Sequence, residues 1–199
     1  MPLSRFLCFL IGAALAASAS PVQNPAPIAA ADLPEAEFQT LVEKTNLYVK
    51  ALNAASYAQR SYDRYASWVN VKKGPTGKER YISYGLYEIS KSQVDEVKQA
   101  AKKGPRLSPA LPDLDVVIVR LAESFGALEP LVKKAADYYE QEDYKDDNAR
   151  GAQELHAGMM PLFQEVFAAE TELRRGLDGL KTQVDRRQLV LLEKRSGRK

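Results

Sequence analysis

The sequence is poor in the residues that build reactive centres. It contains one cysteine (Cys8) and one histidine (His156). Cys8 lies in the apolar N-terminal stretch, so the rest of the chain has no thiol nucleophile and no disulfide framework. With one histidine and no Gly-x-Ser-x-Gly motif, the sequence offers no hydrolase triad. The Glu-x-x-His motif of di-iron bundles is also missing. We therefore predict no enzymatic activity, no catalytic residue and no cofactor.

Strong net charge and long hydrophobic runs are also missing. The formal net charge is +2, and 45% of the residues are apolar while 27% are charged. This balance is ordinary for a globular domain and gives no indication of nucleic-acid binding. The apolar run Phe6–Leu15 is shorter than the roughly 20 residues that span a membrane. We expect no transmembrane segment once this run has been removed.

The N-terminus has the layout of a secretory signal peptide. Arg5 precedes the apolar run Phe6–Leu15, and the small residues Ala17-Ser18-Ala19 form a cleavage site. Lipidation of Cys8 is disfavoured, because Leu7 is not the small residue expected before a lipid-modified cysteine. The organisation predicted is a signal peptide at 1–19, a Pro/Ala-rich linker at 20–31 and a helical-bundle domain at 32–199. The predicted location is the periplasm or the extracellular space.

Apolar residues recur at helical spacing along most of the mature chain, which predicts an all-α fold. The first predicted helix begins at Asp32, whose carboxylate is placed to cap free amides, with Glu35 at the capping-box position. No glycine or proline interrupts this helix before Gly74. Asn46 and Asn53 lie beside its apolar face. They are interpreted either as a buried polar pair that fixes helix register or as ligand contacts.

Three more helices are predicted, and together they indicate an elongated antiparallel bundle of long amphipathic helices. One covers Ser92–Lys103. Another is capped by Asp113 and contains Pro130, where a kink is easily accommodated. The last runs from Asp147 towards Lys194, a rod of about 70 Å.

The segment Lys72–Ser90 does not follow this pattern. Its Gly74-Pro75-Thr76-Gly77 is a turn, and it lacks the spacing of a phosphate-binding loop. Tyr81, Tyr84 and Tyr87 fall on one helical face, but the same stretch also alternates like a strand, and both interpretations stay open. All ten tyrosines and the tryptophan lie between Tyr48 and Tyr144. Such amphipathic rings suit a core or a groove for recognition.

The stretch "YYEQEDYKDDNARGAQELHAGMM" (138–160) joins the last two predicted helices and is rich in carboxylates. One interpretation is a helix corner, in which Asp146 and Asp147 lie near the free amides and the positive end of the last helix. The other is a metal site. An EF-hand is excluded by the spacing, but a looser calcium site at Asp143, Asp146 and Asp147 is not. His156 also shares a helical face with Met159 and Met160, a donor set suited to copper(I).

Several stretches resemble the DUF3829 family of uncharacterised bacterial envelope proteins, many of which are predicted lipoproteins. They are the Asn46…Asn53 pair, "KKGPTGKERYISYGLYEI", and "YYEQEDYKDDNARGAQELH" with the helix that follows. The resemblance implies an all-helical envelope domain and no known activity. Four residues of the third stretch recur in the family. With their neighbour Asp146 and the two asparagines, the candidate binding residues are Asn46, Asn53, Tyr144, Lys145, Asp146, Asp147 and His156.

Relatives continue beyond the long last helix, so the resemblance implies that C-terminal helices of the bundle are missing here. The exposed apolar face would then predict a homodimer, or fraying, at this end. The predicted function is that of an exported, non-enzymatic helical-bundle protein. Its partner would be an unidentified envelope protein or ligand. The alternative is a periplasmic protein that binds calcium or copper through the acidic corner and His156.

Overall fold

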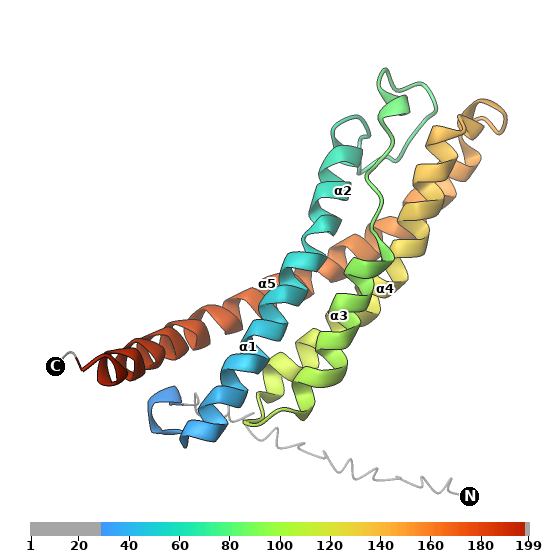
Figure 1. Cartoon of the computed structure of the whole chain (residues 1–199). Helices are drawn as coiled ribbons and strands as arrows, with labels where there is room; N and C mark the ends of the chain where they lie inside the picture. Colours follow the sequence, from blue (N-terminus) through green and yellow to red (C-terminus); the bar gives the residue numbers. More distant parts are fainter. Residues whose placement is uncertain (1–28, 198–199) are drawn as a thin grey trace, which may run out of the picture.

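The computed structural model describes residues 29–197 of the chain (Figure 1). The predicted signal peptide and most of the predicted linker lie outside the described residues. Every regular element in the described part is a helix, and none is a strand, so the predicted all-α class is confirmed. No helix between residues 29 and 197 combines the length and the apolar character needed to cross a membrane.

Five α-helices build an elongated bundle (Figure 1). They are α1 (Glu35–Ala55), α2 (Tyr57–Ala66), α3 (Lys91–Lys103), α4 (Pro112–Glu140) and α5 (Arg150–Arg195). Four short 3-10 turns accompany them: η1 (Ala30–Asp32), η2 (Ile82–Tyr84), η3 (Gly104–Arg106) and η4 (Asp143–Lys145). Helices α4 and α5 pack along each other, α3 lies between α1 and α4, and α2 continues the direction of α1.

The first predicted helix is broken at Ser56, so the prediction of one uninterrupted rod is wrong. The Ser56 hydroxyl donates to the carbonyl of Asn53 at 2.7 Å, and the helical hydrogen bond from the Arg60 amide to the Ser56 carbonyl is long, at 3.4 Å. A serine hydroxyl that bonds to the preceding turn is an alternative to the regular helical ladder. The break therefore occurs without glycine or proline, which is why the sequence pattern did not indicate it.

The predicted caps at Asp32 and Asp113 are also wrong. Helix α1 begins after Pro34 and α4 after Leu111, and neither of these N-cap residues caps its helix through a side chain. Proline at the first position of α4 needs no hydrogen-bond acceptor, because it has no N–H group. Helix α3 does have a capping box. The Ser90 hydroxyl accepts from the Gln93 amide, and the Gln93 side chain accepts from the Ser90 amide.

The two internal prolines do not end their helices. Helix α4 continues through Pro130 and α5 through Pro161. Segment 72–90 forms neither a regular helix nor a strand. It is irregular apart from η2, and Ile82, Leu86 and Ile89 anchor it by burying their side chains.

The start of the described chain is hydrogen-bonded to α5. Ala30 is fully buried, its amide donates to Gln183 Oε1 at 3.2 Å, and its carbonyl accepts from Arg187 at 2.5 Å. The guanidinium of Arg187 also lies 4.3 Å from the centre of the Phe38 ring. These contacts fix the level at which α1 packs on α5.

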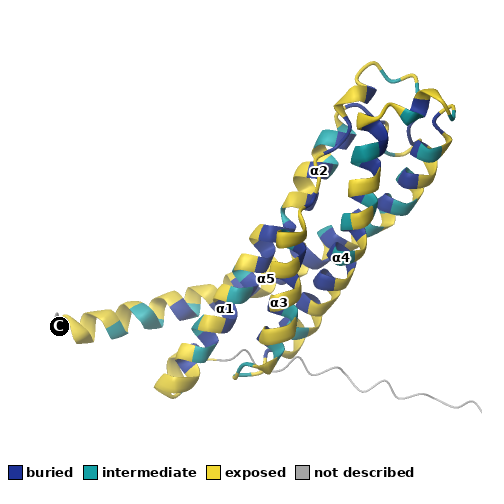
Figure 2. Ribbon diagram, turned by 45° about the vertical axis from the view of Figure 1, so that its right-hand side comes forward, coloured by how far each residue is buried: buried dark blue, intermediate teal, exposed yellow. Residues whose placement is uncertain are grey.

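The C-terminal part of α5 extends away from α3 and α4 (Figures 1 and 2) but stays beside the start of α1, where Arg195 lies 3.7 Å from Glu35. Its exposed apolar residues are Leu189, Val190 and Leu192. Self-association through this end remains a prediction.

A buried ion pair joins α1 to the start of α4. The Lys44 side chain has no exposed surface, and its ammonium lies 2.8 Å from Asp115 Oδ1. The same ammonium donates to the carbonyls of Leu107 at 3.2 Å and Pro109 at 3.1 Å. Asp115 in turn accepts from the Tyr48 hydroxyl at 2.5 Å. A buried charge is tolerated when it is paired and its hydrogen-bonding capacity is used.

The backbone around this ion pair is closely packed. A Cβ atom at Gly104 would lie 2.1 Å from Cε1 of the Tyr48 ring, so only glycine fits where η3 passes the ring. The chain from α3 to α4 is thereby held against α1, close to the Tyr48 hydroxyl that donates to Asp115.

Replacing Lys44 by Met is expected to lower the free energy of unfolding by about 3–5 kcal/mol, because Asp115 and two carbonyls lose their buried partner. Urea denaturation followed by circular dichroism measures this. A matched control is Lys181→Ala, which breaks the exposed Lys181–Asp185 pair and should change the free energy by less than about 1 kcal/mol. A Lys44→Met variant as stable as the control would contradict the prediction.

Candidate functional site

The end of the bundle where α2, α4 and α5 meet is built from aromatic residues. The ring of Tyr65 packs edge-on against Trp68 at 5.2 Å between centroids, and Trp68 packs edge-on against Tyr139 at 5.0 Å. Tyr138 and Tyr144 add further rings beside Tyr139. Edge-to-face pairs of this kind stabilise a fixed arrangement beyond simple burial. Most of the candidate residues are placed around this cluster.

The acidic stretch forms the corner between α4 and α5, as one of the two interpretations predicted. Asp147 accepts from the Tyr138 hydroxyl and from the amide of Gly151 in the first turn of α5, both at 2.8 Å. The hydrogen bond from the Gly151 amide is the main reason why the pKa of Asp147 is lowered. Helix α5 begins at Arg150, slightly later than predicted, after Asn148 and Ala149 in the left-handed region.

The other candidates at the corner have different surroundings. Tyr144 is buried beside Tyr139, so its ring belongs to the aromatic cluster. Lys145 is exposed and bonds to Glu142 at 2.5 Å, and this hydrogen bond is the main cause of its raised pKa. Asp146 is exposed, on the outer side of the corner. The structure therefore brings Asp147 and Tyr144 into the packing and leaves Lys145 and Asp146 at the surface.

His156 connects α5 to α2 and to the loop that follows α2. Its Nδ1 lies 3.0 Å from the Tyr65 hydroxyl, and the imidazole also bonds to the backbone of Val71. Gly74 has φ +78°, and a Cβ atom there would lie 3.2 Å from the His156 ring. Burial lowers the pKa of His156, although the bond to Val71 acts in the opposite direction.

A second glycine brings the same loop onto the corner. Gly77 has φ +77°, a region that favours glycine, and a Cβ atom there would approach Ala149 Cβ to 2.8 Å. The Thr76 amide and hydroxyl both donate to Glu79 Oε1 at 2.7 Å, which closes the turn. The predicted turn at 74–77 thus packs against His156 and the start of α5.

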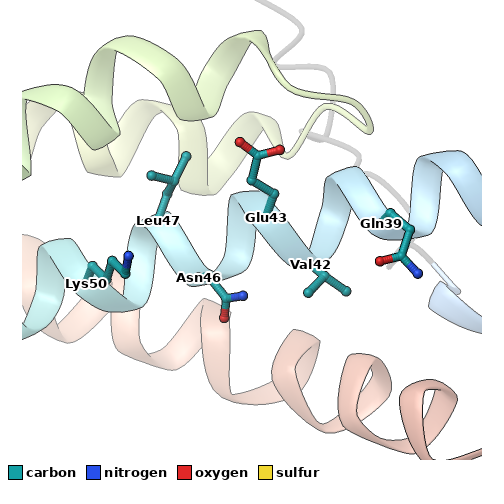
Figure 3. A pocket seen from close by; sticks show the side chains of 6 residues that line it. All are labelled: Gln39, Val42, Glu43, Asn46, Leu47 and Lys50. Carbon is teal, nitrogen blue, oxygen red and sulfur yellow. The ribbon is translucent and has the colours of Figure 1, made fainter. Parts of the chain in front are cut away.

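Asn46 and Asn53 are both exposed on α1, so the interpretation as a buried pair that fixes helix register is wrong. Asn46 lines a shallow surface depression of about 440 Å³ whose lining residues all come from α1 (Figure 3). They are Gln39, Val42, Glu43, Asn46, Leu47 and Lys50. Asn53 is not among them. A hollow formed by one face of one helix does not bring groups from different elements together.

The geometry does not assemble the predicted metal site. Among residues 29–197, no group of three or more histidine, cysteine, aspartate or glutamate side chains is placed to hold a metal ion. Asp147 is already engaged by a hydroxyl and an amide. Met159 has no exposed surface and belongs to the core.

The sequence pattern did not indicate a surface made of stacked tyrosine and arginine side chains. Tyr81 and Tyr84 stack at 5.1 Å with an interplanar angle of 22°. The guanidinium carbon of Arg64 lies 4.3 Å from the centre of the Tyr84 ring and 5.4 Å from that of Tyr87. We name this surface the tyrosine–arginine strip. It comprises Tyr57, Arg60, Arg64, Arg80, Tyr81, Tyr84 and Tyr87.

A buried carboxyl group on α5 was also missed as a titrating site. Glu170 is 8% exposed, and its Oε1 has no hydrogen-bond partner. Burial raises the pKa of Glu170 to about 7, against a smaller opposing effect of Arg174. Tyr62 of α2 packs against Phe167 at 5.3 Å. Because α5 runs antiparallel to α1 and α2, Glu170 lies one turn beyond Phe167, near the level of the α1–α2 break.

The model of the family described as "Protein of unknown function (DUF3829)" matches residues 39–199. The chain is 34% identical over 206 residues to the uncharacterized protein YiiG of Escherichia coli (strain K12). That alignment covers 94% of this chain and 55% of the relative, so the chain spans about half the relative's length. No solved structure matches.

Lowering the pH below about 6.5 is expected to weaken the contact between the loop and His156. The folded pKa lies below the unfolded value, so the unfolded chain binds more protons in this range. The stabilisation is complete above about pH 6.5 and declines as the pH falls towards the folded pKa. Amide hydrogen exchange of residues 70–78 at pH 7.5 and 5.5 measures this after correction for intrinsic exchange rates. His156→Gln should remove the pH dependence, and equal protection of the wild type at both pH values would contradict the prediction.

Glu170→Gln is expected to stabilise the protein at pH 8 and to change little at pH 5. The raised pKa means that the folded state binds more protons between pH 4.5 and 7, so wild-type stability falls as the pH rises through that window. A shift from 4.5 to about 7 corresponds to about 3 kcal/mol above pH 7. Urea denaturation at the two pH values measures it, with the exposed Glu165→Gln on the same helix as control. A stability gain that does not depend on pH would contradict the prediction.

Proposed function

We propose, from the premise that this chain belongs to the DUF3829 family of proteins of unknown function, that it is an exported helical-bundle protein of the bacterial cell envelope that acts by binding. The family match and the E. coli relative agree with the resemblance of its sequence motifs. The N-terminal pattern of Arg5, Phe6–Leu15 and Ala17-Ser18-Ala19 supports export. The proposed location is the periplasm or the extracellular space.

The observation that carries the binding role is the tyrosine–arginine strip. Its four tyrosines are between 39% and 53% exposed, although large aromatic side chains are usually buried more deeply. Tyrosine and arginine are the residue types enriched at protein–protein hot spots. The contacts between them hold the side chains in place before a partner arrives, which lowers the conformational entropy lost on binding. The strip is therefore the surface that we assign to recognition.

Catalysis has less support than binding. The titrating groups with shifted pKa values are dispersed, with His156 under the loop and Glu170 inside the bundle. A general acid or base must reach a substrate in a cleft together with a second reacting group. The described depressions are shallow, and the one around Asn46 is lined by a single helix. The metal-binding alternative is weaker, because Asp147 already accepts hydrogen bonds from Tyr138 and Gly151 and Met159 is buried in the core.

Photo-crosslinking in the native envelope tests this proposal. A benzoylphenylalanine at Tyr87, within the strip, is expected to capture a partner, because this residue is 53% exposed and lies against Arg64. The matched control is the same probe at Val116 on α4, which is 67% exposed and outside the strip. Captured species are identified by mass spectrometry, together with the N-terminus of the periplasmic protein, expected at Ser20. An intact Met1 terminus in the cytoplasm, or equal capture at both positions, would overturn the proposal.

A further inference from the structure

The three arginines of the tyrosine–arginine strip are held by aromatic rings and not by carboxylates. Arg60 lies over Tyr57 at 5.0 Å, Arg64 lies over Tyr84 at 4.3 Å, and Arg80 lies near Tyr81 at 5.1 Å. None of the ion pairs formed among residues 29–197 involves these arginines. A stacked guanidinium keeps its in-plane N–H donors available for a planar anion such as a carboxylate. The strip thus presents oriented N–H donors that have no carboxylate partner among residues 29–197.

The acidic residues near the strip are engaged elsewhere. Between residues 57 and 91, the seven lysines and arginines outnumber the three aspartates and glutamates, a net charge of +4. Asp63 accepts from Gln59, Glu79 accepts from Thr76, and Glu88 lies 3.9 Å from Lys133. The segment that carries the strip is therefore positive, and this charge favours an acidic partner.

The stacking also limits what kind of anionic partner fits. Tyr84 has Arg64 at 4.3 Å and the Tyr81 ring stacked at 5.1 Å, so the strip already uses this ring for its own contacts. A sugar ring would need a free aromatic face, whereas ring edges, phenol hydroxyls and guanidinium donors suit the carboxylates and backbone of a polypeptide.

We infer that the tyrosine–arginine strip binds an acidic segment of a partner protein, with carboxylates paired to Arg60, Arg64 and Arg80. This inference rests on the proposed binding function and names the class of partner. Arg60 and Arg64 are four residues apart on α2, so their guanidinium groups lie on one helical face. Arg64 also donates from Nε to the carbonyl of Tyr84 at 3.2 Å, which fixes its orientation. Carboxylates spaced along one chain can then engage neighbouring arginines at the same time.

Fluorescence anisotropy with labelled decaglutamate tests the inference on the purified protein at physiological salt. Arg60→Gln with Arg64→Gln is expected to weaken binding at least about tenfold, because two charge-assisted pairs are lost. The matched control is Arg175→Gln with Arg186→Gln, two exposed arginines of α5 outside the strip. The control removes the same charge and should change the affinity by about twofold or less. Equal weakening by both double variants would overturn the inference, since general electrostatic attraction would explain it.

Two further variants test whether binding requires oriented N–H donors or only positive charge. Arg64→Lys keeps the charge but loses the planar fork, and Tyr84→Ala keeps every charge but removes the ring that supports Arg64. Each is expected to weaken decaglutamate binding about threefold or more while thermal unfolding stays cooperative. Tyr84 is 46% exposed, so its truncation leaves the core intact. Unchanged affinity in both variants would overturn the role of the stacked arginines.

The remaining outcomes distinguish other ligands and the proposed function itself. Self-association that disappears in the Arg60/Arg64 double variant would assign the strip to a second copy of this chain. Stronger competition by polyphosphate than by decaglutamate would assign it to a phosphate-bearing ligand. Either result overturns the inference. A strip that captures an envelope component from Tyr87 but does not bind decaglutamate would refute the acidic partner and leave the binding function standing.

Discussion

The end of the bundle where α3 is connected to α4 depends on one constraint, the buried charge of Lys44. An ammonium without exposed surface requires an anion and further acceptors, and Asp115 and two backbone carbonyls supply them. The two carbonyls, of Leu107 and Pro109, lie on the connection between α3 and α4, and Asp115 lies in the first turn of α4. One side chain of α1 therefore holds both the connection and the start of α4. Apolar packing alone is compatible with several helix registers, whereas this polar cluster is satisfied in one.

The other end of the bundle, at the corner between α4 and α5, depends on the close approach of the loop backbone to α5. Gly74 and Gly77 hold the loop against His156 and Ala149, and the corner between α4 and α5 is held from inside by Asp147. The carboxylates of the acidic stretch thus have unequal roles. Asp147 satisfies a free amide of α5, where the helix end favours negative charge, while Asp146 stays outside. The irregular segment beyond α2, which carries Tyr81, Tyr84 and Tyr87, is attached to this closely packed end through Gly74 and Gly77.

The sequence predicted the features that depend on local periodicity. The helical class and the long α4 and α5 follow from apolar spacing, which reports one face of a helix. It did not predict features that depend on residues far apart in the chain. Lys44 and Asp115 are 71 residues apart. Tyr81, Tyr84 and Tyr87 fit both helical and strand spacing, and only their contacts with each other and with Arg64 of α2 decide their arrangement. The Ser56 break was missed because serine is compatible with either a helix or a turn.

The polar groups of the protein fall into two kinds: those with partners inside the bundle and those that point their donors outwards. Lys44, Asp147 and His156 have partners inside the described chain, and their hydrogen-bonding capacity serves packing. The arginines of the tyrosine–arginine strip have rings beneath them and form no ion pair within residues 29–197. A polar group whose partners are internal contributes to stability, whereas an oriented group without an internal counter-charge is available for binding. The strip is therefore a stronger candidate for recognition than the acidic corner, although the corner is the more unusual stretch of sequence.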